Sequence, residues 1–390
     1  MLSHDGYPGL ASAMRSLTPL LQVLPSPVHV VAPASLACDD AVDRAELQRR
    51  INVEAARNAV PAPVLVSQLP ATAGVFNEVV GSALGLTRAA MPSWQQFTVT
   101  GAGGTTLRCY AAGAATAPAV LVVAPCGMPV ELIAPWLAAL AQRFRVLTWE
   151  TCGLFGTAAE RAALDDSYLE GTPRERVQAQ SADALRVLGH CGVAYADVIG
   201  LCGGAVLALA AAVERPDLVR SVSLWHADFL VRGPNCRTQH QANLSAVLDI
   251  GARSEAAAAS VYDVLTRSLL DGLPPDLAHL VLHPYATPQM LYRYCRVNGA
   301  IMALDAGELV PDVAQPVLVV TSEDDHTAHP NASRDVAGSL ASGELVVRPH
   351  GDHIALFRGA ADLFALATDF ISDQTRRAAA ESAKKNRAIV

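Results

Sequence analysis

Apolar runs separated by helical segments occupy most of the chain after residue 96. The runs are PAVLVVAP, FRVLTWE, ADVIGLC, VRSVSLWHA, QPVLVVTS and GELVVRP. Each is apolar at nearly every position instead of at alternate positions, which is typical of strands buried on both faces. Such strands, with helices between them, form a three-layer α/β domain. We therefore predict an α/β core with a mostly parallel sheet between helices.

One long interval breaks this alternation of strands and helices. Residues 228–311 have mostly helical periodicity and no clear strand, so we predict a helical cap inserted over the end of the sheet. The core then consists of residues 96–227 and 312–375. Residues 376–390, which carry the one basic run, are predicted to be a solvated C-terminal tail.

The first 95 residues follow a different pattern, in which prolines repeatedly interrupt regular structure. Asp39 and Asp40 can cap a helix whose apolar positions recur every four residues, at Leu47, Ile51 and Ala55. A second short helix is predicted around residues 75–85. Residues 1–95 are therefore expected to form a helical and irregular N-terminal extension.

Composition limits the partners and the compartment. The 390 residues are 51% hydrophobic and carry a net charge of −8, which suits one large core and argues against a nucleic-acid partner. The eight cysteines are scattered and lack a C-x-x-C pair, as is typical of a reducing compartment. No run approaches the roughly 18 apolar residues of a membrane span. We expect a cytoplasmic protein without a membrane span.

The segment VIGLCGGAVLALA, residues 198–210, is the clearest candidate for chemistry. Gly200, Cys202 and Gly204 form a G-x-nucleophile-x-G pattern, in which a strand turns sharply into a helix and exposes the central side chain. A Cβ two residues to either side would collide with the neighbouring strand and helix. Because the positive end of the following helix stabilises an anion, we predict that Cys202 is a nucleophile; a buried cysteine in an ordinary turn is the alternative.

A longer stretch, DALRVLGHCGVAYADVIGLCGGAVLALAAAVERPDLVRSVSL, resembles the α/β-hydrolase superfamily. It has the succession of helix, strand, nucleophile turn, helix and strand of that superfamily, down to the R-P-D-x-V-R link. The resemblance covers roughly residues 97–372. It implies the α/β-hydrolase fold, with a helical cap insertion and a helical N-terminal extension added to it.

The resemblance also implies an acid and a histidine base that follow Cys202 in the chain. The segment PVLVVTSEDDHTAHP resembles the acid-bearing turn and gives Asp325, with its neighbour Asp324 as the fallback. The segment VVRPHGDHIALF resembles the histidine loop and gives His353. His353 would take the Cys202 proton while Asp325 holds the ring. Asp228, just after another strand, is an alternative acid position in parts of the superfamily.

An oxyanion hole needs two backbone N–H groups aimed at the tetrahedral oxygen. The resemblance implies one from Gly203, directly after the nucleophile, and one from Met128, in a loop where Cys126 replaces the superfamily's common histidine. Trp149 and His226 end strands on the active-site side of the predicted sheet. They are candidates for binding substrate, with a packing role as the alternative.

Four histidines form two H-x-x-H pairs, at His326, His329, His350 and His353. Zinc-binding pairs lie on one face of a helix, whereas these lie in predicted turns, and the triad already uses one of them. We therefore expect no metal. The Gly-rich turn at 101–104 is followed by neither a helix nor a lysine, so we expect no phosphate-binding loop and no cofactor.

A cysteine nucleophile favours acyl transfer over simple ester hydrolysis. An acyl-cysteine is itself a thioester, so capture from a thioester donor is near thermoneutral and leaves a reactive intermediate. SEDDHTAHP and GDHIALF are also similar to segments of polyhydroxyalkanoate synthases, and dienelactone hydrolases, like some thioesterases of polyketide and nonribosomal peptide assembly, have a cysteine elbow.

The leading hypothesis is an acyltransferase or thioesterase. It would take an acyl group from a thioester of CoA or of an acyl carrier protein onto Cys202 and pass it to an acceptor or to water. Ester or lactone hydrolysis by the same triad is one alternative, and a catalytically silent ligand-binding scaffold is another. Association into a homo-oligomer stays open.

Overall fold

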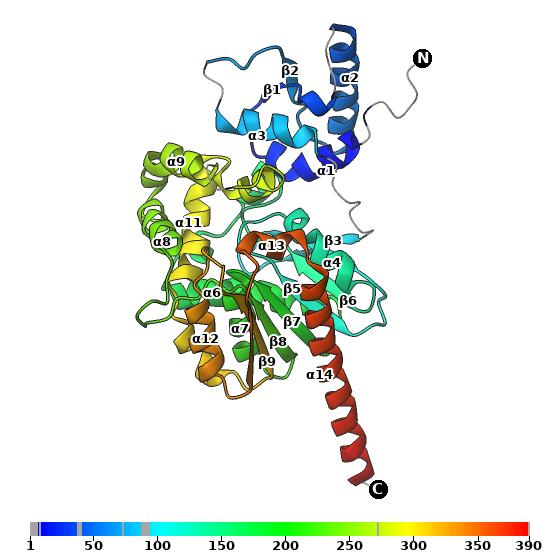
Figure 1. Ribbon diagram of the computed structural model, residues 1–390, viewed down its shortest axis with the longest axis vertical. Coiled ribbons are helices and arrows are strands. Elements are labelled where there is room, and N and C mark those ends of the chain that lie inside the picture. The colour runs from blue at the N-terminus through cyan, green and yellow to red at the C-terminus, as the bar shows by residue number, and fades with distance from the viewer. Residues whose placement is uncertain are drawn as a thin grey trace.

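An eight-stranded sheet forms the centre of the molecule, in the order β10-β9-β8-β7-β5-β6-β4-β3 (Figure 1). The structure is a computed structural model that describes residues 7, 9–36, 41–71, 74–86, 94–270 and 273–388. β4 is antiparallel to both of its neighbours, and the other strand pairs are parallel. The strands are β3 (Gln95–Thr100), β4 (Thr106–Ala112), β5 (Ala119–Val123), β6 (Arg145–Trp149), β7 (Ala196–Leu201), β8 (Val219–Trp225), β9 (Val317–Ser322) and β10 (Gly343–Arg348).

Helices cover both faces of this sheet. Every residue of β7 is buried, and Val198 packs into the core on one face while Ile199 packs into the core on the other. The first face is covered by α6 (Pro173–His190), α7 (Gly204–Glu214) and α12 (Pro330–Ser339); the second by α4 (Ala134–Leu140), α13 (His353–Arg358) and α14 (Ala361–Ala388). The mostly parallel sheet between helices, predicted from the continuous apolar runs, is confirmed.

The segment between β8 and β9 is helical. It contains α8 (Gln239–Gly251), α9 (Glu255–Leu270), α10 (Ala278–Val281) and α11 (Pro288–Ala303). Thr238 and Gln241 begin α8 with a capping box. α11 packs against α8 and α9 on one side and against α6 of the core on the other. These helices therefore lie on the core as one unit, beyond the carboxyl ends of the strands (Figure 1).

The N-terminal unit is built from α1 (Leu10–Leu21), α2 (Ala41–Arg57) and α3 (Val75–Leu84), with two short parallel strands, β1 (His29–Val31) and β2 (Val64–Val66). The apolar positions predicted for the first of its expected helices are buried in α2, at Leu47, Ile51 and Ala55. The predicted caps, Asp39 and Asp40, lie outside the described residues. α1 and α3 pack on α10, where Ser16 and His279 are hydrogen-bonded at 3.1 Å, so this unit rests on the helical insertion (Figure 1).

The remaining helices are a short α5 (Ala158–Ala162) after β6 and the long C-terminal α14. α14 continues to Ala388, so residues 376–388, predicted as a tail, extend this helix away from the sheet (Figure 1). Of the helices within the described ranges, none combines the length and the apolar character that crossing a membrane requires.

Trp136 of α4 joins the helical layer to the helix that carries His353. Its side chain is fully buried and packs edge-on against Trp225 of β8, with ring centroids 4.9 Å apart, and against Phe364 of α14 at 5.1 Å. Its indole N–H donates a 2.8 Å hydrogen bond to the Leu356 carbonyl of α13. One side chain therefore fixes α13 against the sheet.

We expect Trp136→Ala to lower the free energy of unfolding by about 3–5 kcal/mol, because it removes a large buried aromatic side chain and leaves a cavity. Trp136→Phe keeps most of the packing and loses the hydrogen bond, so its loss should be clearly smaller. Denaturant unfolding of the three proteins measures both effects. A Trp136→Ala protein as stable as the wild type would contradict this role.

Candidate active site

Cys202 lies at the sharp turn from β7 into α7. Its backbone φ is +52°, a left-handed conformation that L residues adopt only under constraint. A Cβ at Gly200 would lie 2.5 Å from the Ala205 Cα, and a Cβ at Gly204 would collide with the Val123 carbonyl oxygen. Both flanking positions therefore exclude a side chain, as the sequence pattern predicts. The turn leaves Cys202 half-buried at the carboxyl end of the sheet.

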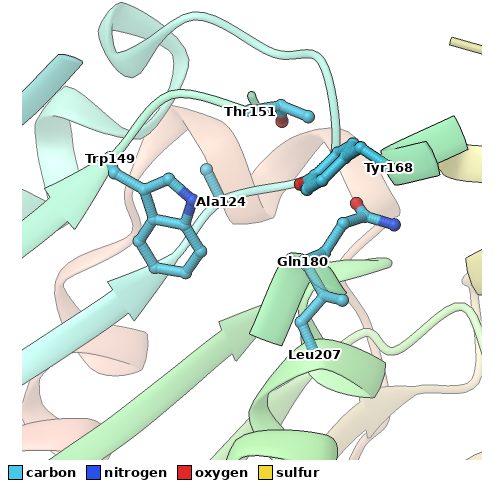
Figure 2. Close-up of a pocket in the computed structure, with 6 residues that line it drawn as sticks. All are labelled: Ala124, Trp149, Thr151, Tyr168, Gln180 and Leu207. Atoms are coloured by element: carbon cyan, nitrogen blue, oxygen red, sulfur yellow. The ribbon is translucent and has the colours of Figure 1, made fainter. Parts of the chain in front are cut away.

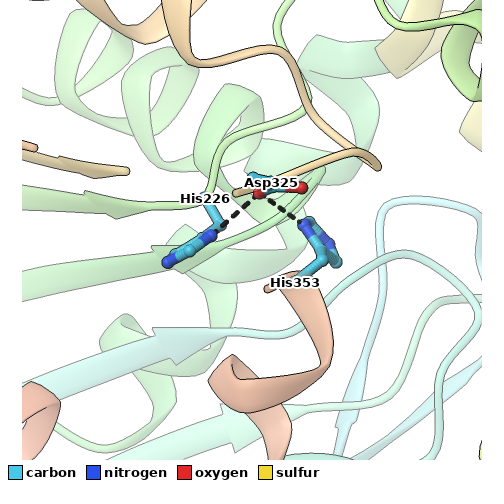
Figure 3. A group of neighbouring side chains, drawn as sticks. All are labelled: His226, Asp325 and His353. Carbon is cyan, nitrogen blue, oxygen red and sulfur yellow. Dashed lines mark hydrogen bonds and ion pairs between the residues drawn. The ribbon is translucent and has the colours of Figure 1, made fainter. Parts of the chain in front are cut away.

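His353 and Asp325 come together from separate strand ends. Asp325 lies in the turn after β9, and His353 is the first residue of α13, after β10. His353 Nδ1 donates to Asp325 Oδ2 at 3.0 Å (Figure 3). The other carboxylate oxygen, Oδ1, accepts the backbone N–H groups of Thr327 and Ala328, each at 2.9 Å. Asp325 is thus held in place on both sides and orients the ring of His353.

His353 also faces Cys202. Both side chains line one cavity, and Cys202 is close enough to raise the pKa of His353. Burial by itself lowers the pKa of His353, but Cys202 and the hydrogen bond from His353 to Asp325 outweigh it and hold this pKa well above its usual value. A histidine beside the thiol, oriented by a carboxylate, is the arrangement that a cysteine nucleophile requires.

His226 makes a second hydrogen bond to the same carboxylate oxygen. Its Nδ1 donates to Asp325 Oδ2 at 2.8 Å, so two histidine rings converge on one oxygen (Figure 3). Burial by itself would raise the pKa of Asp325, but the hydrogen bonds from His226 and His353 hold it far below its usual range. Asp325 is therefore an anion at neutral pH.

The structure does not place His226 against substrate. Its side chain is 1% exposed and is not among the residues that line the Cys202 cavity. Within the described part of the chain its Nε2 has no hydrogen-bond partner. Because β8 lies beside β9, the residue after Trp225 comes next to the turn that carries Asp325. The position of His226 at a strand end correctly predicted that it lies at the active-site edge of the sheet. The residue contacts Asp325 there and does not line the Cys202 cavity.

Neither of the two alternative acids is hydrogen-bonded to His353 in the described residues. Asp324 pairs with His350 at 2.9 Å, and both side chains are exposed. Asp228 lines the cavity and accepts a hydrogen bond from Gln241. Of these carboxylates only Asp325 has a hydrogen bond to His353 in the described residues.

One of the two predicted oxyanion donors faces the cavity freely. Gly203 lines the cavity beside Cys202, and no backbone hydrogen bond of the described residues uses its N–H. Met128 also lines the cavity, but its N–H donates to the Pro125 carbonyl at 3.2 Å. The preceding residue, Gly127, donates its N–H to Thr151 Oγ1 at 2.8 Å. Met128 can serve as the second donor only if its turn hydrogen bond opens.

Trp149 lies in a different place from the one predicted. It borders a separate cavity of only about 10 Å³, together with Thr151, Tyr168 and Gln180 (Figure 2). That volume is at the lower limit for one water molecule and is too small for a substrate. Trp149 is therefore a packing residue in this structure, which was the alternative to the predicted binding role.

The cavity at Cys202 has a volume of about 290 Å³, close to the lower end of small-molecule sites. One wall is apolar and is formed by Met128, Leu132, Leu244, Leu273, Val281 and Phe357. Polar groups also face it, at Asp228, His240, Tyr285, Tyr294, Asn298 and Thr327. Many of these residues belong to the helical insertion, so that segment shapes the space in front of the thiol.

The two H-x-x-H pairs do not converge. His350 pairs with Asp324, the side chain of His329 caps α12 through the Asn331 N–H, and His353 pairs with Asp325. In the described residues the one group with three ligand atoms close together is His226, Asp325 and His353. There both histidine Nδ1 atoms are already hydrogen-bonded to the carboxylate.

A bacterial protein assigned as a hydrolase is similar in sequence to this chain. RutD of Stutzerimonas stutzeri (strain A1501), assigned as a carbamate hydrolase, is 22% identical over 271 residues, which are 68% of this chain and 95% of that protein. No model of a protein family matches the chain.

Solved structures share the fold. The enol-lactonase from Burkholderia xenovorans LB400 superposes with a TM-score of 0.53 at 20% identity and covers 71% of this chain and 100% of its own. A thermophilic esterase from Thermogutta terrifontis gives a TM-score of 0.53 at 17% identity, with 72% of this chain and 99% of its own covered. At these identities the likeness concerns the fold.

We expect thiol-specific alkylation at neutral pH to modify Cys202 first. His353 pairs with its sulfur, whereas burial raises the pKa of both Cys109 and Cys126 to about 12. His353→Ala should slow the alkylation of Cys202 on the order of tenfold. Peptide mass spectrometry over time measures each site, and the half-buried Cys191 is the internal control. Equal rates at Cys202 and Cys191, unaffected by His353→Ala, would contradict the pairing.

Glu150, next to Trp149, should make stability depend on pH. It is 3% exposed; burial and the nearby Glu131 carboxylate raise its pKa to about 8, against 4.5 for an ordinary glutamate. Between these values the folded protein keeps a proton that the unfolded chain releases, so this contribution to stability is full below about pH 4.5 and falls as pH rises towards 8.

Unfolding measured at pH 6 and pH 8 tests this contribution. The wild type should lose on the order of 2 kcal/mol more than Glu150→Gln between the two values. Glu344→Gln, which removes an exposed acid of β10, is the matched control and should behave as the wild type. An identical pH dependence in Glu150→Gln and wild type would show that Glu150 is already ionised at pH 6.

Proposed function

We propose that this chain, which has the α/β-hydrolase fold, hydrolyses carboxylic ester or thioester bonds through an acyl intermediate on Cys202. One observation carries the proposal. Cys202, held at φ +52° between two obligatory glycines, shares a cavity with His353, whose ring is fixed by the buried Asp325. A nucleophile, a base and a group that orients the base are the parts that covalent acyl chemistry requires.

In the acylation step the Cys202 thiolate attacks the carbonyl carbon of the substrate. An S–C bond forms, and the carbonyl π electrons move to oxygen, where the Gly203 N–H is placed to stabilise the negative charge. The intermediate collapses, the bond from carbon to the leaving oxygen or sulfur breaks, and the His353 imidazolium gives its proton to the leaving group. Asp325 stays ionised throughout and holds the ring.

In the deacylation step water replaces the leaving group. Neutral His353 takes a proton from a water molecule as its oxygen attacks the acyl carbon. The S–C bond then breaks, a carboxylic acid leaves, and the thiolate and imidazolium are restored. No further reactant is needed.

Hydrolysis is placed ahead of acyl transfer because the similar proteins support it. The similar proteins are a carbamate hydrolase, an enol-lactonase and an esterase, and each of these activities is hydrolysis at a carbonyl carbon. This order reverses that of the sequence-based hypothesis, in which an acyltransferase or thioesterase came first.

Transfer of the acyl group to another acceptor is the second candidate. The observation in its favour is the sulfur nucleophile itself, since an acyl-Cys202 is a thioester and reacts with amines and thiols as well as with water. The acyl donor would then be a thioester of CoA or of an acyl carrier protein. Both candidates share the first half-reaction and differ only in what attacks the intermediate.

Intact-protein mass spectrometry tests the shared step. The wild type is incubated with a panel of acyl-CoA and acyl-N-acetylcysteamine thioesters and p-nitrophenyl esters, beside Cys202→Ala, His353→Ala and the control Cys191→Ala. We expect an acyl adduct on the wild type and on Cys191→Ala and none on Cys202→Ala. Acylation of His353→Ala should be slower by about 10²–10⁴-fold, the usual range for loss of a general base.

The fate of the adduct separates the candidates. Release of free acid at the rate at which the adduct decays supports hydrolysis, and faster decay on addition of an amine or thiol, with formation of its acyl derivative, supports transfer. No adduct and no turnover with any member of the panel would overturn the proposal and favour a ligand-binding scaffold.

A further inference from the structure

Asp228 is the acidic side chain that faces the cavity without belonging to the Cys202, His353 and Asp325 group. It follows β8 and is half-buried. From the geometry described below, we propose that Asp228 is a binding site for an amine or ammonium group of the substrate, and that it selects acyl compounds that carry such a group away from the reacting carbonyl. This inference rests on the proposed function in placing the carbonyl at Cys202.

A buried amide fixes the carboxylate in place. Gln241 of α8 is 2% exposed, and its Nε2 donates to Asp228 Oδ1 at 2.5 Å. The amide cannot be reversed, because its Oε1 accepts two backbone N–H groups, from Thr238 at 2.9 Å and from His329 at 3.1 Å. The capping box of α8 therefore determines the direction in which Asp228 is held.

One oxygen of Asp228 is left for a ligand. Among the described residues its carboxylate accepts a single hydrogen bond, the one from Gln241 to Oδ1. A carboxylate accepts up to four hydrogen bonds, and an incompletely paired anion in a partly buried site is costly. A substrate N–H group that donates to Oδ2 would remove this cost. A substrate carboxylate or phosphate at the same place would be repelled.

The charges around Asp228 favour a cation as well. His240 faces it from α8, and burial lowers the pKa of His240, so this ring is neutral at neutral pH. His353 lines the cavity from α13, but its charge is matched by the Asp325 carboxylate, to which it is hydrogen-bonded. Arg237 acts on Asp228 from the exposed loop before α8 and does not line the cavity. Among the described residues that line the cavity there is no Lys or Arg, and the cationic histidine is already paired with Asp325.

The cavity also reaches solvent and has an apolar part to its lining. His240 lines it and is exposed to solvent, and apolar side chains such as Leu244 and Val281 line it as well. A molecule that has a carbonyl, a short apolar chain and an amine suits a cavity that holds Cys202, apolar side chains and Asp228.

Calorimetric binding to the full-length Cys202→Ala protein tests the inference without catalysis. The probes are N-acetyl-1,3-diaminopropane and N-acetyl-1,5-diaminopentane, each paired with its uncharged isostere, N-butylacetamide or N-hexylacetamide. In at least one pair we expect the ammonium compound to bind about tenfold more tightly or better, as for one charge-assisted hydrogen bond. Adding Asp228→Asn should reduce that preference to less than about twofold.

Two further variants keep the result interpretable. Asp312→Asn, which removes an exposed acid outside the cavity, should keep the full preference. Asp228→Ser replaces the carboxylate by a smaller side chain. It should lose the preference for ammonium compounds, as Asp228→Asn does. Equal affinity within each pair, absence of binding by all four probes, or a preference that survives in both Asp228 variants would overturn the inference.

The outcome is separable from that of the proposed function. Adducts on Cys202 without any preference for ammonium compounds would leave the hydrolase proposal in place and remove the role of Asp228. A preference that depends on Asp228, without adducts from any thioester or ester, would show an amine-binding cavity and remove the hydrolase proposal.

Discussion

The carboxylate of Asp325 is the point on which the candidate active site depends. It accepts hydrogen bonds from two histidine rings on one oxygen and from two backbone N–H groups on the other. These bonds join the ends of β8 and β9 to the start of α13, three segments far apart in the sequence. Four donors keep a buried carboxylate ionised, and an ionised carboxylate keeps His353 oriented towards Cys202.

A second constraint is steric and acts at the elbow. The strand, the nucleophile turn and α7 approach so closely that neither Gly200 nor Gly204 has room for a Cβ, and Cys202 itself takes a left-handed conformation. Such a conformation costs about 1–3 kcal/mol, which the packing of the fully buried β7 and of α7 offsets. The packed turn therefore holds Cys202 in the lining of the cavity.

The helical insertion decides what can reach that thiol. α8 supplies Leu244, His240 and, through Gln241, the orientation of Asp228, while α10 and α11 complete the cavity. The N-terminal unit packs mainly on α10, and Arg108 of β4 donates a 3.2 Å hydrogen bond to Gln22 after α1. The core thus holds the reacting groups, and the segments added to it shape the space in front of them, a division common in folds that host many activities.

The sequence by itself determined the layered core, the elbow at Cys202 and the positions after β9 and β10 that supply Asp325 and His353. These features depend on continuous apolar runs, on two glycines at fixed spacing and on the order of strands, all of which are local patterns. The positions of Asp325 and His353 also follow from the resemblance to the α/β-hydrolase superfamily, in which the acid and the histidine come after the nucleophile in the chain. The chemical roles of these residues stay predictions that alkylation and acylation will test.

Only the tertiary structure decided which residues stand around this group. His226 is hydrogen-bonded to Asp325, and Trp149 borders a separate cavity. The Met128 N–H is hydrogen-bonded within its own turn. The tertiary structure also brought Asp228 into the cavity of Cys202. Each of these depends on how neighbouring strand ends and the inserted helices pack against one another, and contacts between residues tens of positions apart leave no periodic or spacing signal in the chain.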